Sequence, residues 1–184
     1  MIATPHCAIN QAFSDRAHSI AQLMVYPSLF SVESHQLAFD DVTGIDIERN
    51  RVLDGEMAID KIIRVTVNTL HAPLVFTVQE RFRRSDKMRW RDITLTEWNN
   101  NSNRPSELYK IKAGLFVYGY YDEYKDRLVG ETLVVNVPAL LIRLASKRIK
   151  YETKLNPRSN QTFITIPFSS LDEYGLIEDR YIWK

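Results

Sequence analysis

Asp60, Gln79 and Arg81 are the side chains whose types and spacing most favour chemistry. Asp60 lies in the largely apolar stretch MAIDKIIRVTV, and the other two lie in FTVQERFRR. Side chains alternate along a strand, so on two neighbouring strands Asp60 can share a face with Gln79 and Arg81. Carboxylate and amide oxygens suit Mg²⁺, and a nearby cation can stabilise charge that develops on a phosphorane. The pattern therefore predicts a divalent-metal site for phosphodiester hydrolysis.

The same residues resemble the signature of the PD-(D/E)XK nuclease superfamily. That signature is an acid on one strand and an acid-x-Lys tripeptide on the next, so Asp60 corresponds to the first acid and residues 79–81 to the tripeptide. The resemblance covers roughly residues 14–121, and it implies a restriction-endonuclease-like fold, a Mg²⁺ cofactor and DNA as the substrate. Gln79 adds no charge and Arg81 cannot accept a proton from water. Arg81 is then expected to stabilise charge, while a carboxylate or metal-bound hydroxide acts as the base.

Two further side chains could complete the site that the resemblance implies. Asp54 could add the charge that Gln79 lacks, and Lys110, in SELYKIK, could be a lysine moved onto a following helix, as in some members of the family. The expected metal ligands are Asp60, Gln79 and Asp54. Structural alternatives stay open, because Asp54 could form a turn before Gly55 and Lys110 could be a solvated helix residue.

The strand pattern also has a purely structural interpretation. Alternation such as QERFRR occurs on any half-exposed strand, and Asp60 could pair with Arg64 or Arg81 as a structural ion pair. A register shift of one residue would bring Glu80, rather than Gln79, to the face of Asp60. In the expected register, Asp60, Gln79 and Arg81 converge on one concave face of the sheet.

A basic cluster follows the second of these strands. Residues 81–91 include six basic side chains against one acid, Asp86, with Phe82 and Trp90 between them. In an otherwise neutral chain, such a cluster can follow a phosphate backbone. The expected nucleic-acid contacts are Arg83, Arg84, Lys87 and Arg89. The alternative is a solvated basic hairpin tip.

Hydrophobic periodicity and turn residues predict the elements that position these side chains. Helices are expected at residues 11–26, with Ser14 as the cap and Pro27 after the end, at 105–112, at 138–147 and near Leu171. Strands are expected at residues 57–67, 73–82, 90–98, 114–121, 133–137 and 162–166. Short turns make the first three strands an antiparallel meander. The order predicts an α/β fold with a mixed central sheet flanked by helices, restriction-endonuclease-like.

Composition predicts one compact domain over residues 1–184. Of the 184 residues, 45% are hydrophobic and 26% are charged, and 24 basic residues balance 23 acidic ones. A chain of this length buries roughly 70% of its unfolded surface, so it needs no disulfide or structural metal. The net charge therefore predicts no class of binding partner, and any such prediction must rest on how the charges are distributed along the chain.

The numbers and spacing of cysteine and histidine residues bear on the cellular location and on zinc chemistry. Cys7 is the single cysteine, and the four histidines show no zinc-hydrolase spacing. The sequence shows no secretory signal and no apolar run of membrane-spanning length, so we expect a cytoplasmic protein that does not insert into membranes. Phosphate-binding loops of the GxxxxGK[ST] and GxGxxG types are absent from the sequence.

Three functions are compatible with these patterns. The first is a Mg²⁺-dependent endonuclease that acts on DNA, possible as a homodimer because double-strand cutting needs two sites. The second is an inactive descendant of the nuclease fold that binds nucleic acid or serves in assembly. The third is a small-molecule-binding α/β protein. Dependence on divalent ions separates the first from the second, and salt-dependent DNA binding separates both from the third.

Overall fold

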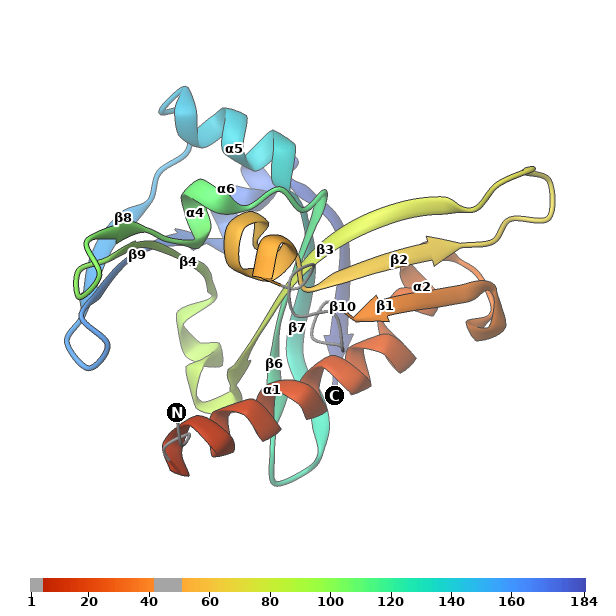
Figure 1. The fold of residues 1–184 in the computed structure, drawn as a ribbon, viewed down its shortest axis with the longest axis horizontal. Helices are drawn as coiled ribbons and strands as arrows, with labels where there is room; N and C mark the ends of the chain where they lie inside the picture. Colours follow the sequence, from red (N-terminus) through yellow and green to blue (C-terminus); the bar gives the residue numbers. More distant parts are fainter. Residues whose placement is uncertain (1–4, 42–50) are drawn as a thin grey trace.

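The computed structural model describes residues 5–41 and 51–184 of the chain. Two β-sheets and the helices packed on them make up the fold, and helix α1 (Pro5–Met24) runs across one face of the larger sheet (Figure 1). The expected α/β class and mixed central sheet are therefore confirmed. None of the described helices carries an apolar stretch long enough to cross a bilayer.

The larger sheet has six strands in the order β1-β2-β3-β6-β7-β10. Neighbouring strands are antiparallel, except that β3 and β6 run parallel. The strands are β1 (Leu37–Asp41), β2 (Lys61–Val65), β3 (Leu74–Arg84), β6 (Leu115–Asp122), β7 (Arg127–Asn136) and β10 (Ile177–Trp183). A parallel pair needs a long crossover, and this crossover supplies part of a second sheet.

The second sheet has four antiparallel strands in the order β5-β4-β9-β8. They are β4 (Asp92–Asn99), β5 (Arg104–Pro105), β8 (Glu152–Asn156) and β9 (Gln161–Pro167). The expected meander is therefore wrong in its third strand, because residues 90–98 supply β4, which pairs with β9. The 3-10 helix η3 (Ser85–Trp90) ends at Arg91 with φ 43° and turns the chain away from β3. The antiparallel triple is β1, β2 and β3.

The first helix differs from its expected limits. α1 begins at Pro5, so Ser14 lies inside the helix and does not cap it. Pro27 does not follow the helical region but lies in the first turn of a second helix, α2 (Tyr26–Phe30). Proline fits there because the first helical N–H groups have no intrahelical partner. The short segments η1 (Ser34–Gln36) and η2 (Arg51–Glu56), the latter a turn of π-helix, follow.

Two of the later helices are shorter than their patterns predicted, and the helix expected near Leu171 is present. α4 covers only Glu107–Lys110, because Pro105 pairs with Trp98 as part of β5. α5 (Val137–Ala145) begins where the Asn136 side chain accepts a hydrogen bond from Ala139 N at 2.9 Å. This side-chain cap satisfies an N–H that the helix itself cannot satisfy. α6 (Phe168–Glu173) follows β9.

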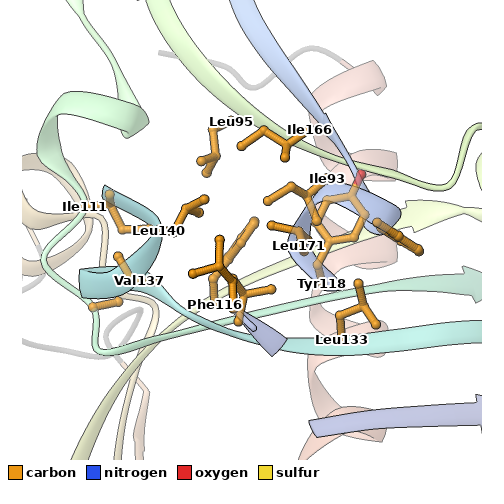
Figure 2. Close-up of a cluster of buried hydrophobic side chains, with 14 of the residues drawn as sticks. Ile93, Leu95, Ile111, Phe116, Tyr118, Leu133, Val137, Leu140, Ile166 and Leu171 are labelled. Carbon is orange, nitrogen blue, oxygen red and sulfur yellow. The ribbon is translucent and has the colours of Figure 1, made fainter. Parts of the chain in front are cut away.

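Two apolar clusters hold these layers together. One packs α1 and α2 against the larger sheet, with Ala21 facing Val78 and Val117 among others. The other fills the space between the two sheets, where Figure 2 shows Phe116 and Tyr118 beside residues of β4, α5 and α6. Alternation along each strand decides which cluster a side chain joins. On β3, even-numbered residues therefore face α1, and odd-numbered residues face the second sheet.

Candidate active site

A polar groove of about 590 Å³ lies between α1 and the edge of β3, where β2 begins. β2 pairs with β3 only as far as Lys61 opposite Val78, which leaves the next part of β3 beside the groove. Besides polar side chains of α1, the lining residues are Asp54, Asp60, Lys61, Gln79, Glu80 and Arg81. Asp60, Gln79 and Arg81 thus line one groove. Glu80 also lines it, on the face of β3 that is turned toward α1, whereas Gln79 and Arg81 lie on the other face of the strand.

Asp60 is held at the end of the β2–β3 ladder by two hydrogen bonds. Its N–H donates to Val78 O at 2.9 Å, and its Oδ2 accepts from Glu80 N at 2.7 Å. Burial raises the pKa of the Asp60 carboxyl to about 7, although the bond from Glu80 N acts in the opposite direction, and the nearby carboxylates of Glu80 and Asp54 contribute to the rise. A carboxyl so perturbed in a groove is typical of functional sites.

The structural ion pairs considered for Asp60 are made by other acids. Arg64 Nη2 lies 2.8 Å from Asp40 Oδ1, and Arg81 Nη2 lies 2.5 Å from Glu107 Oε2. The Asp60 carboxylate is therefore not held by either arginine.

Gln79 presents a buried carbonyl oxygen to the same place. The β2–β3 ladder ends at the pair of Lys61 with Val78, so Asp60 and Gln79 are the next residues along the two strands, and both line the groove. Gln79 is only 8% exposed, and its Oε1 finds no hydrogen-bond partner among the described residues. Leaving a buried acceptor unsatisfied costs about 1–3 kcal/mol, so this oxygen is free to take a ligand.

Arg81 is fixed by contacts that reach the second sheet. Its Nη1 donates to Thr94 O at 3.1 Å, and its Nη2 donates to Glu107 Oε2, which also accepts from Thr96 N at 3.0 Å. The Arg81 side chain is 28% exposed, and these bonds use two of the five guanidinium N–H groups. Glu107, at the start of α4, therefore balances the charge of Arg81 and sets its direction.

Glu80 is the centre of a buried polar network on the α1 side. Its side chain is 0% exposed, and it accepts hydrogen bonds from Tyr26 Oη and His18 Nδ1. Lys61 Nζ lies 3.8 Å from Glu80 Oε2. Both oxygens of this carboxylate are therefore engaged by protein groups, which joins α1 and α2 to the sheet.

His18 connects this network to the groove. Burial disfavours its charged form, but the hydrogen bond to Glu80 and the negative charges of Glu80 and Asp60 outweigh burial, so the pKa of His18 is raised above its usual value. Its Nε2 lies 2.9 Å from Ser14 Oγ, one turn earlier on α1. The groove therefore holds an imidazole oriented on both sides.

The two remaining candidates lie in different places. Asp54, in η2, lines the groove and is exposed. Lys110 ends α4 and is not among the residues that line the groove. The lysine that does line it is Lys61.

The donor set suits a cation that keeps much of its water. Among residues 5–41 and 51–184, no three His, Cys, Asp or Glu side chains come together in a group that could hold a metal ion. Asp60 and Gln79 nevertheless both line the groove with hard oxygen atoms, and Mg²⁺ is commonly bound by one or two protein ligands together with water and substrate phosphate. The residues present therefore fit Mg²⁺ as a weakly held ion and do not fit a closed metal site.

The basic cluster is largely paired within the protein. Arg83 Nη1 lies 2.9 Å from Asp92 Oδ1 and also donates to Tyr118 Oη. Arg84 pairs with Glu123, and Lys87 Nζ lies 2.5 Å from Asp86 Oδ2. Arg89 packs over the Trp90 ring at 5.3 Å. The expectation that these four side chains contact DNA stays a prediction.

Comparison of the chain with protein-family models, with curated proteins and with solved structures gave no match. The superfamily resemblance therefore rests on the residues and on the order of elements.

Sequence reasoning assigned no role to His18, Lys61 or Glu107, and it considered Glu80 only for a shifted register. The spacing of Ser14 and His18, four residues apart on one helix face, was an available signal. The contacts between His18 and Glu80, and between Arg81 and Glu107, join distant segments, and the local pattern carries no sign of them.

Proposed function

We propose that this chain is a Mg²⁺-dependent endonuclease of the restriction-endonuclease-like fold that hydrolyses phosphodiester bonds in DNA. The observation that carries the proposal is the buried Oε1 of Gln79, without a partner among the described residues, in the groove that Asp60 also lines. An orphaned acceptor beside a carboxylate is what a cation site requires.

The charge of the groove supports a cation. Four acids line it, Asp15, Asp54, Asp60 and Glu80, against the cations Lys61 and Arg81 and the imidazole of His18. Above the pKa of Asp60, about 7, these acids outnumber the fixed cations, so a phosphate that entered alone would meet an excess of negative charge. A bound cation would reverse the local field and allow the phosphate to approach.

In this proposal, each side chain of the groove has a separate role in binding the metal ion or the phosphate. Mg²⁺, when bound, would polarise the phosphate and acidify a water molecule. Asp60 and Gln79 would hold the ion, with Asp54 at the rim. Arg81 would use its remaining N–H groups to hold a phosphate oxygen, and because it stays protonated it would act by charge alone.

The order of elements also supports the fold. The resemblance implies a leading helix, three antiparallel strands and then a helix-strand unit, and α1, β1–β3 and α4–β6 give this order, although the expected triple was residues 57–67, 73–82 and 90–98. In this chain the second sheet is inserted between β3 and β6.

A second candidate is an inactive nuclease-fold protein that binds nucleic acid or serves in assembly. It is favoured by the engagement of both Glu80 oxygens and by the pairing of Arg81 with Glu107. These contacts leave Asp60 as the principal anionic ligand near Gln79.

The test is a plasmid-nicking assay with Mg²⁺, Mn²⁺ or EDTA. We expect metal-dependent nicking by the wild type, loss of nicking in Asp60→Asn, and tighter metal binding with retained activity in Gln79→Glu. Asp40→Asn is the matched control, because Asp40 pairs with Arg64 on the same sheet and does not line the groove. Absence of cleavage in every sample, together with absence of metal binding, would leave the inactive candidate.

A further inference from the structure

A second cavity, of about 340 Å³, lies on the face of the smaller sheet that is turned away from the core. Asp92 and Thr94 of β4 and Thr165 of β9 line it, whereas the intervening Ile93 and Ile164 are buried in the core between the sheets. The cavity walls therefore offer hydroxyl and carboxylate groups at the positions that alternate with core residues.

Trp90 forms an aromatic wall of this cavity and is 48% exposed. Three cations surround its ring: Arg83 Cζ lies 4.8 Å from the ring centroid, and Lys87 Nζ and Arg89 Cζ each lie 5.3 Å away. A half-exposed indole in a basic setting is the kind of surface on which nucleobases stack.

The charges inside the cavity are balanced, and the excess lies at its rim. Arg83 pairs with Asp92 at 2.9 Å, and Lys154 pairs with Glu152 at 2.9 Å. Arg89 makes no ion pair within the described part of the chain, so its charge is available beside Trp90. The cavity thus suits a neutral flat ring, with an anionic group attached near Arg89.

We propose that this cavity binds one unpaired base of a single-stranded DNA segment. The base stacks on Trp90, its polar edge meets Thr94, Thr165 and Asp92, and its phosphate lies near Arg89. In a duplex both faces of a base are covered by neighbouring bases, so only an unpaired or extruded base can enter. This inference rests on the proposed nuclease function and names its substrate class.

The cavity is joined to the groove through β3. Arg81 lines the groove and donates to Thr94 O, while Thr94 itself lines the cavity. Arg81 and Arg83 are two residues apart on the same face of β3, a separation of about 7 Å along the strand. One nucleotide of an extended strand covers such a distance, so a base in the cavity places a neighbouring phosphate toward the groove.

The test measures binding of labelled single-stranded and hairpin-duplex oligonucleotides by the full chain in EDTA, where metal-dependent cleavage cannot occur. We expect Trp90→Ala to weaken single-strand binding roughly 5- to 100-fold and duplex binding less than about twofold, and Trp90→Phe to retain most of the affinity. Tyr124→Ala is the matched control, because Tyr124 is an exposed aromatic that does not line the cavity.

A second measurement needs no protein variant. In a series of short oligonucleotides that each carry one abasic position, affinity should fall for a single position, and quenching of the protein's tryptophan fluorescence should be lost with it. Equal losses on single strand and duplex, or affinity that ignores every abasic position, would overturn the inference. Trp90-dependent single-strand binding without cleavage would retire the nuclease function alone. Cleavage with no effect of Trp90→Ala would retire this inference alone.

Discussion

Replacing Asp60 by Asn should stabilise the protein at pH 8 but not at pH 4. The pKa of Asp60 rises from 3.8 to about 7 in the folded state, chiefly through burial. The folded state therefore binds this proton more tightly than the unfolded state, and wild-type stability falls as the pH rises from 3.8 to 7. At about 1.4 kcal/mol per pH unit, the loss reaches at most about 4 kcal/mol. Asn carries no charge and still offers an oxygen to Glu80 N, so it avoids this loss.

The measurement is urea unfolding of both proteins at unit steps from pH 4 to pH 8. The stability difference should grow with pH and level off above pH 7. Asp126→Asn is a control of opposite sign, because hydrogen bonds from Arg16 and Tyr121 hold the pKa of exposed Asp126 at about 2, so its loss should destabilise the protein across this range. An Asp60→Asn protein that is less stable than wild type at pH 8, or a difference that does not change with pH, would refute the reasoning.

Three further outcomes are expected. Glu80→Ala should lower the free energy of unfolding by about 3–5 kcal/mol in urea titrations, because it leaves buried polar partners unpaired; a loss below about 1 kcal/mol would contradict the network. The pKa of His18 in an NMR titration should exceed 6.5 and should fall in Glu80→Gln. The stability that the His18 proton contributes is therefore fully present below pH 6.5 and is lost as the pH rises through the folded pKa. A titration midpoint below 6.5 would contradict the raised pKa. Gly119→Ala should lower the free energy of unfolding by about 1–3 kcal/mol, because a Cβ there would lie 2.5 Å from Thr132 Oγ1 and 3.1 Å from the Phe82 ring. Thermal unfolding measures this change, and an unchanged melting temperature would show that both side chains can move aside.

Features that depend on neighbouring residues could be predicted from the sequence. Alternation predicted that Asp60, Gln79 and Arg81 come together, and all three line one groove beside β3. The mixed sheet followed from the order of strand and helix patterns.

Features that depend on distant residues could not be predicted in this way. β4 alternates like any half-buried strand, and its apolar face fits the second sheet as well as it would fit a meander with β3. The pairing of β4 with β9, for example Asn99 with Gln161, joins segments that are far apart in the sequence, and the local pattern of β4 does not specify this partner. Glu107 was likewise hidden, because its role depends on where the crossover brings α4.

The pairing of early strands with late ones has a consequence for how the chain matures during translation. β9 completes the smaller sheet, and β10 covers the edge of β7, where Gly130 meets Trp183. Neither layer can close until residues 161–183 have left the ribosome, and such distant contacts form slowly because a long loop must close first. A nascent chain halted before residue 161 would therefore expose unpaired strand edges and would be prone to aggregation or degradation. The Thr94 carbonyl of β4, which accepts a hydrogen bond from Arg81, would take its final place only after synthesis of those residues.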